Sequence, residues 1–359
     1  MPDLESLRQK ILDIDREIIR LIGARLEVTR KIGREKAESG IPLRNWKVEK
    51  EVIAHAQKEA EMLNIDVQFI KAVMQILIRE SWIQQEKLHY SRYRGNKERI
   101  LVVGGLGAMG RWLVRFFQNQ GHRVYIYDTK GSSDDFDCFD SLEKGLEKVG
   151  YAIIATPLDT VARVIREITK LNFSGIVFDI ASLKGHLIDA IEDARTRGIR
   201  ITSIHPMFGP DCRSLADKVV CLCDCGVHTA NQKIEEMFKD TAVSLVRLSL
   251  REHDYIISYV LGLSHLINII FMNVLIRGGE YKDFKRVGST TFFSQLKTTR
   301  SVIDEDPRLY YAIQQLNPFK DELYNRLRSA VDTITNIVLN KDEKRFIEIM
   351  EQAREWFKR

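Results

Sequence analysis

The chain has 359 residues, of which 44% are hydrophobic and 29% charged, and this composition is typical of a globular protein with about two or three domains. The net charge of +5 comes without a basic tail, so we expect no nucleic-acid partner. Five cysteines, an odd number, and no signal peptide before Leu4 favour a cytoplasmic protein without a disulfide framework.

The first 92 residues show a helical pattern and no strand pattern. Apolar residues recur every three or four positions from Leu4 to Ile32, which predicts one long amphipathic helix that ends near the glycine and proline of residues 39–42. Two further helices are predicted at about 48–63 and 67–90. Three such helices bury little surface alone, so a dimerisation or coiled-coil segment is the plain alternative to a functional domain.

Cations on the first predicted helix suggest an anion site. Arg25 and Lys36 are eleven residues apart, about three turns, and therefore share a face. Arg8 lies roughly 25 Å before Arg25 along a helix and can join the same pocket only from a partner chain. Ser81 and Gln85, four residues apart on the third helix, offer uncharged hydrogen bonds. Without a nucleophile or metal set, this pattern suits chemistry by positioning and electrostatics, and solvated surface charge is the alternative.

A dinucleotide signature follows. The apolar run 99–105 predicts a strand that leads through Gly105-Leu-Gly107-Ala-Met-Gly110 into a helix, so that a pyrophosphate can sit at the helix N-terminus. A second strand at 122–127 ends at Asp128, whose carboxylate can accept hydrogen bonds from a ribose and would repel a 2′-phosphate. We therefore expect NAD as cofactor, and Lys130 nearby keeps NADP open. The candidate cofactor contacts are Gly105, Gly107, Met109, Gly110 and Asp128.

Later apolar runs alternate with helical stretches, which predicts a parallel, doubly wound α/β sheet over residues 98–248. The strands are expected at 152–156, 176–180, 199–204 and 219–223. Cys221, Cys223 and Cys225 alternate along the last of these and are predicted to be structural thiols, because no Cys or His pair follows at the spacing of a zinc site. We expect no metal.

His205 follows the apolar strand 199–204 and precedes a loop rich in proline and glycine. Ligands of open α/β sheets bind at the carboxyl ends of the strands, and imidazole has a pKa suited to proton transfer near neutrality. The sequence therefore predicts a base at a ligand site. A loop histidine that caps a turn is the alternative.

Residues 249–359 are predicted to be entirely helical. The segment 255–276 has no Asp, Glu, Lys or Arg and is long enough to span a bilayer. Its polar residues recur at helical spacing, so we expect instead a helix buried on every side within a soluble domain, with a polar stripe facing a site, and no membrane partner. These polar residues are Ser258, Gly262, His265, Asn268 and Asn273.

These motifs resemble two known families over nearly the whole chain. Residues 1–92 are similar to all-helical chorismate mutases through SLRQKILDID, the stretch from Arg25 to Lys36, GIPLRN and ESWIQQ. Residues 98–359 resemble prephenate dehydrogenases through VVGGLGAMGRW, DIASLKG, HPMFGPD, EHD and DPRLYYAI, of which HPMFGPD is the most specific. The resemblance implies a bifunctional enzyme of tyrosine biosynthesis that converts chorismate to prephenate and oxidatively decarboxylates prephenate with NAD to 4-hydroxyphenylpyruvate.

The fold implied is an all-α three-helix domain at 1–92, an α/β doubly wound Rossmann domain at 98–248 and an all-α dimerisation and substrate-binding domain at 249–359. The protein is therefore expected to be a homodimer. Because no regulatory domain follows, feedback by tyrosine would act at the dehydrogenase site.

For the mutase, the resemblance implies that charged and amide side chains surround chorismate. Arg25 and the partner chain's Arg8 would bind the carboxylates, with Ser81 near one of them, and Lys36 with Gln85 would bind the ether oxygen. Two positions depart from the family, because Asn45 stands where many relatives have aspartate and Val48 where an arginine is common. The ring hydroxyl would meet Glu49 and Asn45.

For the dehydrogenase, the resemblance implies that His205 accepts the proton of the ring hydroxyl while hydride leaves the same carbon for the nicotinamide. Thr156 matches a hydroxyl near the nicotinamide and this histidine, and His265 matches a substrate-binding histidine. Arg300 matches an arginine that binds a substrate carboxylate, with a spacing one residue longer than in relatives. Lys297 and Arg286 are its alternatives.

Two other functions remain compatible with parts of the sequence. One is another NAD(P)-dependent dehydrogenase of the 6-phosphogluconate-dehydrogenase-like class, whose N-terminal helices would serve only dimerisation or regulation. The other is a nucleotide sensor without catalysis. Neither requires HPMFGPD.

Overall fold

The computed structural model describes residues 3–39, 45–90, 95–239 and 241–358. The chain divides into two compact units, which are described separately. The first comprises Met1–Ala181 and Asp189–Ser249, and the second comprises Ser182–Ile188 and Leu250–Arg359.

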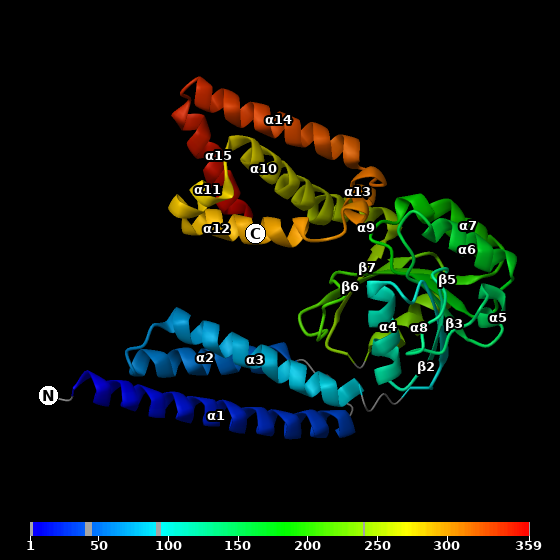
Figure 1. The fold of residues 1–359 in the computed structure, drawn as a ribbon, viewed down its shortest axis with the longest axis horizontal. Helices are drawn as coiled ribbons and strands as arrows, with labels where there is room; N and C mark the ends of the chain where they lie inside the picture. The colour runs from blue at the N-terminus through cyan, green and yellow to red at the C-terminus, as the bar shows by residue number, and fades with distance from the viewer. Residues whose placement is uncertain (1–2, 40–44, 91–94, 240, 359) are drawn as a thin grey trace. The chain divides into compact units, whose positions relative to one another are not determined.

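Three helices open the first unit, as the sequence predicts. Helices α1 (Leu4–Ser39), α2 (Trp46–Met62) and α3 (Val67–Tyr90) lie side by side (Figure 1). The second half of α1 turns its less exposed positions toward α3, whereas apolar residues of its first half, Ile11 and Ile18 among them, remain exposed. An exposed apolar stripe on a helix is typical of a surface that pairs with another molecule. Of the run GIPLRN, only Asn45 lies within the described residues.

A seven-stranded sheet forms the centre of the first unit, in the order β2-β1-β3-β4-β5-β6-β7. Its neighbouring strands are parallel except for β5 and β6, which are antiparallel. The strands are β1 (Arg99–Val103), β2 (Arg123–Tyr127), β3 (Tyr151–Ile154), β4 (Ile176–Asp179), β5 (Arg200–Pro206), β6 (Val219–Asp224) and β7 (Ser244–Ser249).

The expectation of a uniformly parallel sheet is therefore wrong at β6. The connection from β5 to β6 spans residues 207–218 and holds no helix, and a short connection of this kind reverses the chain, whereas a parallel pair needs a crossover. Strand β7 was not predicted. It is an edge strand of intermediate and exposed residues, so it lacks the buried apolar run that marks the other strands.

Helices cover both faces of this sheet and bury its apolar strands. Helices α4 (Ala108–Asn119) and α8 (His228–Phe238) share one core with alternate residues of β1, which include Ile100 and Val102. Buried aromatic rings of α4 and α8 stack there, with Phe116 and Phe238 5.6 Å apart between centroids. The remaining helices of the unit are α5 (Leu142–Leu146), α6 (Val161–Lys170) and α7 (Ile188–Thr196).

The second unit is helical throughout the described residues, as predicted. It contains a short 3₁₀ turn, Gly185–Leu187, and a π-helical turn, Ser258–Leu263, between α9 and α10. Its helices are α9 (Leu250–Ile257), α10 (Ser264–Gly278), α11 (Tyr281–Val287), α12 (Thr290–Ile303), α13 (Pro307–Gln315), α14 (Lys320–Leu339) and α15 (Glu343–Trp356).

The expectation that the apolar segment is buried on every side is wrong. Only 17% of the most apolar stretch of Leu250–Gly278 is buried, although its length and composition would let it cross a membrane. Most of its polar stripe points inward, with Ser258 and Asn268 buried, whereas Asn273 and apolar residues such as Ile270 and Val274 are exposed. Hydrophobicity does not specify which surface covers an apolar face, and an exposed apolar face is typical of a site where another molecule binds.

Candidate active sites

Arg25 of α1 meets α3 at a polar junction. Its Nη1 donates to Ser81 Oγ at 2.6 Å and to the carbonyl of Leu77 at 2.9 Å. Thr29, one turn further along α1, is buried and lies 3.4 Å from the same Ser81 oxygen. Burial lowers the pKa of the Arg25 guanidinium, because desolvation disfavours its charge. A half-buried cation beside a hydroxyl can bind a carboxylate.

Lys36 follows Arg25 along α1, and Gln85 lies one turn after Ser81 on α3. Gly33 lets the two helices approach, since a Cβ there would lie 3.0 Å from Gln85 Cγ. Gln85 is 6% exposed, and its Oε1 has no hydrogen-bond partner among the described residues. Burial lowers the pKa of the Lys36 ammonium, while the nearby Glu49 carboxylate opposes that shift. The structure thus gathers polar groups whose hydrogen-bonding capacity is partly unused.

Two predicted mutase residues stand apart from this junction. Arg8 lies in the exposed first half of α1, with its guanidinium 3.9 Å from Glu5. Asn45 caps α2, because its Oδ1 accepts from the N–H groups of Lys47 at 3.1 Å and Val48 at 3.4 Å. The sequence did not single out this capping role.

The glycine-rich loop follows β1 and begins α4. The residue of this turn in the left-handed region is Gly104, at φ 83°. Gly105 is instead constrained by packing, since a Cβ there would lie 2.7 Å from Ile126. A Cβ on Gly110 would lie 2.3 Å from the Gly104 carbonyl oxygen, so a glycine there allows α4 to pack closely on the turn. Gly107 is the N-cap of α4, so unpaired N–H groups face the place predicted for a pyrophosphate.

Asp128 and Thr156 border this loop. One carboxylate oxygen of Asp128 accepts from the N–H of Leu106 at 3.0 Å, and the other accepts from the N–H of Lys130 at 2.9 Å. The Lys130 side chain is exposed, and Met109 is half-buried in the first turn of α4. Thr156 Oγ1 is buried without a hydrogen-bond partner among the described residues. These groups can hold a dinucleotide by its ribose and phosphates.

Strand β5 continues past its predicted end at residue 204 and ends at Pro206. His205 therefore lies within the strand, one residue before its end. The residue is buried and stands opposite Cys221 of β6. Cys221, Cys223 and Cys225 are all buried, and among the described residues no three His, Cys, Asp or Glu side chains gather as a metal site. The structure thus places an imidazole at the carboxyl end of a strand, where ligands of open α/β sheets bind.

Two of the predicted site residues, His265 and Arg300, lie in the second unit. His265 Nδ1 is buried without a partner among the described residues, and its ring stacks on Tyr310 with centroids 4.2 Å apart. Burial lowers the pKa of this imidazole. Arg300 is exposed on α12 and pairs with Asp304 at 3.1 Å. Lys297 and Arg286, its alternatives, are also exposed.

Sequence reasoning missed three side chains that organise these regions. Tyr310 stacks on His265, and Glu86 of α3 binds the loop after β5. Asp254 holds the turn that begins at Lys184, because its carboxylate accepts from the N–H groups of Lys184 at 2.8 Å and Gly185 at 2.6 Å. Each belongs to, or follows, a motif quoted above, but only its partner reveals its role.

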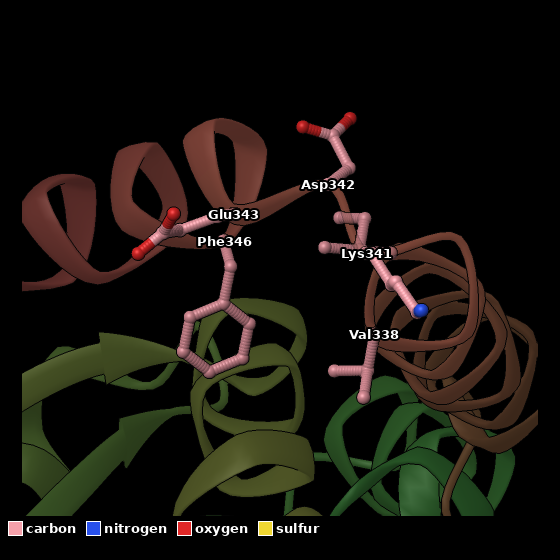
Figure 2. Close-up of a pocket in the computed structure, with 6 residues that line it drawn as sticks. Val338, Lys341, Asp342, Glu343 and Phe346 are labelled. Atoms are coloured by element: carbon pink, nitrogen blue, oxygen red, sulfur yellow. The ribbon is translucent and has the colours of Figure 1, made fainter.

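A hollow of about 410 Å³ lies where α14 turns into α15 and contains none of the predicted site residues. Figure 2 shows Val338 and Phe346 on one side of this corner and Asp342 turned away from them. Its lining combines apolar Ile337, Val338 and Phe346 with charged Lys341, Asp342 and Glu343, and none of these belongs to the motifs quoted above.

Three family models match the chain in succession. Residues 7–86 match chorismate mutase type II, residues 114–246 match the nucleotide-binding domain of prephenate dehydrogenase, and residues 249–352 match the dimerization domain of prephenate dehydrogenase. Together the three matches cover the helices α1 to α3, most of the sheet and the second unit.

Similar proteins cover the same span. The T-protein of Enterobacter agglomerans is 26% identical over 356 residues, which are 99% of this chain and 93% of that protein. The T-protein of Haemophilus influenzae is 24% identical over 361 residues, with the same coverage. Among solved structures, prephenate dehydrogenase from A. aeolicus in complex with hydroxyphenyl propionate and NAD+ has a TM-score of 0.60 at 17% identity, covering 73% of this chain and 97% of that chain. This likeness shows a shared fold.

Proposed function

The chain belongs to the family of bifunctional chorismate mutases and prephenate dehydrogenases, and we propose from that membership how its own residues carry the two reactions. It is an enzyme of tyrosine biosynthesis that rearranges chorismate to prephenate and oxidatively decarboxylates prephenate with NAD to 4-hydroxyphenylpyruvate. The observation that carries this function is one chain that matches a mutase at 7–86 and both domains of a dehydrogenase at 114–352. The alternative function, another NAD(P)-dependent dehydrogenase of the 6-phosphogluconate-dehydrogenase-like class, is not favoured.

The mutase reaction needs no nucleophile, because the rearrangement proceeds within one molecule. Arg25 and Ser81 bind one substrate carboxylate, which their 2.6 Å contact supports. Lys36 and Gln85 bind the ether oxygen and stabilise the charge that develops on it in the transition state. The buried amide oxygen of Gln85, which has no hydrogen-bond partner within the described part of the chain, supports a ligand-facing position, and rotation of the amide would present its NH₂ group instead.

Two further groups complete the mutase proposal. Glu49 meets the ring hydroxyl, and its proximity to Lys36 supports a place in the same pocket. Asn45 assists it only insofar as its amide nitrogen remains available, because Oδ1 caps α2. The partner chain's Arg8 supplies the second carboxylate contact.

NAD supplies the hydride acceptor of the dehydrogenase. The residues fit it, because Asp128 offers carboxylate lone pairs to the ribose diol and the N-terminus of α4 offers N–H groups to the pyrophosphate. Gly105, Gly107, Met109, Gly110 and Thr156 complete the cofactor contacts. A second negative charge beside Asp128 would be repelled, so the residues favour NAD over NADP.

His205 accepts the proton of the ring hydroxyl as the hydride leaves the same carbon. The new carbonyl lets the ring carboxylate leave as carbon dioxide, and the electron pair of that bond restores an aromatic ring, whose carbonyl becomes a phenol. His265 binds the substrate, and its buried Nδ1, for which the described residues offer no hydrogen-bond partner, supports this role. Arg300 binds a substrate carboxylate, with Lys297 or Arg286 as substitutes.

The enzyme is proposed to be a cytoplasmic homodimer. The exposed apolar face of α10 supports pairing of the second unit with its copy, and residues 249–352 match a family dimerization domain. Feedback by tyrosine is proposed at the dehydrogenase site, because the hydroxyphenyl group of tyrosine would resemble the ring of the substrate.

One experiment tests both activities. Purified protein is given chorismate and NAD in one cuvette, and chorismate consumption and NADH formation are followed together. We expect both, with NADH appearing after a lag while prephenate accumulates. Chorismate loss without NADH, even when prephenate is added directly, would refute the dehydrogenase, and NADH from prephenate without chorismate loss would refute the mutase.

A further inference from the structure

Glu86 of α3 is a buried carboxylate that the two proposed reactions do not use. It is 1% exposed, and it accepts hydrogen bonds from the N–H of Leu215, at 3.0 Å to Oε1 and 2.8 Å to Oε2. It also accepts from the hydroxyl of Ser214. These partners lie 128 and 129 residues further along the chain, in the connection between β5 and β6.

The position of Glu86 separates it from the mutase pocket. Gln85, the preceding residue, faces α1 at Gly33, and successive side chains on a helix point about 100° apart. Trp82, one turn earlier, packs against Ala216 and Ala242 on the same side as Glu86. One side of α3 therefore faces the mutase junction, and another contacts Ala242 and the connection between β5 and β6.

The connection 207–218 begins two residues after His205, and it is held at a second place. The indole Nε1 of Trp112, on the helix that follows the glycine-rich loop, donates to the carbonyl of Cys212 at 2.8 Å. The ring of Phe208 packs on the same indole, with centroids 5.0 Å apart. The connection is thus attached to the cofactor helix near its start and to the mutase helix near its end.

The burial of Glu86 is explained by this contact. A carboxylate withdrawn from water is costly unless donors compensate, and here a backbone N–H and a hydroxyl do so. The Ser214 hydroxyl also accepts from the N–H of Ala216 at 3.1 Å, which ties the adjoining turn to the same carboxylate. Removal of the carboxylate would leave the Leu215 N–H buried and unpaired, so the connection would have to move.

We propose that Glu86 is a positioning residue of the dehydrogenase. From the mutase helix α3 it fixes the connection 207–218, which includes residues 207–211 of the HPMFGPD motif. The inference rests on the proposed dehydrogenase activity, because it assigns the residue a role in that reaction. His205 itself is placed by the pairing of β5 with β6, at Cys221. Loss of Glu86 therefore leaves the base in place and disturbs the orientation of the substrate beside it.

The test uses the full-length protein with Glu86→Ala, Ser214→Ala and the conservative Glu86→Gln. We expect Glu86→Ala and Ser214→Ala to lower kcat/KM for prephenate, with losses of about 10- to 100-fold for the first, the usual cost of misplaced reactants. The rise of kcat with pH should be retained in both, because His205 is intact. Glu86→Gln should recover part of the loss, since its amide oxygen still accepts from Leu215. Glu61→Ala, on the exposed side of α2, is the matched control and should behave as wild type.

Two further readouts separate positioning from general stability. The double variant Glu86→Ala/Ser214→Ala should cost little more than Glu86→Ala alone, because both remove one contact. Hydrogen exchange of the peptide spanning 207–218, followed by mass spectrometry without substrates, should be several-fold faster in Glu86→Ala and unchanged in Glu61→Ala. Mutase activity should be unchanged in Ser214→Ala.

Each outcome decides the proposal. Unchanged kcat/KM for prephenate in the variants would overturn the proposal, whether or not hydrogen exchange of 207–218 is faster. Loss of the rise of kcat with pH would also overturn it, since the base itself would then be displaced. If Glu86→Ala does not fold, Ser214→Ala and Glu86→Gln decide by the same criteria. A wild-type enzyme that makes no NADH from prephenate would refute the proposed function, and with it this role for Glu86. Exchange would still show whether the contact exists.

Discussion

The N–H of Leu106 donates a 3.0 Å hydrogen bond to the carboxylate of Asp128. Leu106 lies within the glycine-rich loop, and Asp128 follows β2, so the acid is oriented by the loop that is proposed to bind the pyrophosphate. The acid proposed to select the ribose and the backbone proposed to bind the phosphates are thereby held in one arrangement.

Asp128→Ser should narrow the preference for NAD over NADP, because it removes both the ribose acceptor and the charge that repels a 2′-phosphate. The measurement is the ratio of kcat/KM for the two cofactors. Asp128→Asn separates the causes, since it keeps one acceptor and loses the charge, and exposed Asp135→Ser is the control. An unaltered ratio in Asp128→Ser would mean that another residue sets the preference.

Mixed dimers test the shared mutase pocket. Arg8 and Arg25 lie on one continuous helix, roughly 25 Å apart at 1.5 Å per residue, so they can serve one ligand only from two chains. Arg8→Ala and Arg25→Ala proteins should each be nearly inactive as mutases, and co-refolding them should restore part of the activity. Arg16→Ala, also exposed on α1, should remain active. If mixed dimers form and no activity returns, each pocket belongs to a single chain.

His205→Asn should lower the dehydrogenase kcat by about 10²- to 10⁴-fold, the usual contribution of a positioned base. In wild type, kcat should rise with pH through an ionisation that this variant lacks, because only neutral imidazole accepts the proton. Mutase activity should be spared, since its residues lie on α1 to α3. A variant with near-normal kcat and the same pH profile would direct the search for the base to His265.

Arg300→Ala should raise KM for prephenate far more than it lowers kcat, because a carboxylate contact is present in the ground and transition states alike. The matched control is Arg345→Ala, an exposed arginine that pairs with Glu348 as Arg300 pairs with Asp304. Loss of either surface pair costs little stability. If KM is unchanged in Arg300→Ala, Lys297→Ala and Arg286→Ala become the next variants to measure.

His122 should make the first unit less stable in acid. Its Nδ1 accepts from the N–H of Glu98 at 3.1 Å, and burial, with the charge of Lys97, lowers the pKa of His122 from 6.5 to about 4. The unfolded chain then binds the proton more readily, so stability falls as pH drops from 6.5 toward 4, by roughly 2 to 3 kcal/mol in full. The free energy of unfolding in urea, measured between pH 7 and 4.5, should fall less steeply in His122→Asn. His55→Asn, on exposed α2, should follow wild type, and equal slopes for all three proteins would contradict the assignment.

Local patterns in the sequence were sufficient for much of the fold. The period of apolar residues predicted α1, because a helix presents one face every three to four residues, and Gly40 and Pro42 predicted its end near Ser39. The glycine signature and the acid after β2 predicted the dinucleotide loop, because that turn has steric demands few residues meet, and its left-handed position falls at Gly104. The shared face of Arg25 and Lys36 follows from the same helical geometry.

The tertiary structure alone decided features that depend on residues distant in sequence. The reversal of β6 and the existence of β7 depend on which strand edges are available, and an exposed edge strand carries no apolar signal. The composition of segment 255–276 predicted a helix buried on every side, yet its apolar side is exposed. Hydrophobicity alone does not specify which surface covers an apolar side chain. Glu86 resembles any surface glutamate in the sequence. Its carboxylate gains a role only when folding brings the N–H of Leu215, 129 residues away, within hydrogen-bond distance.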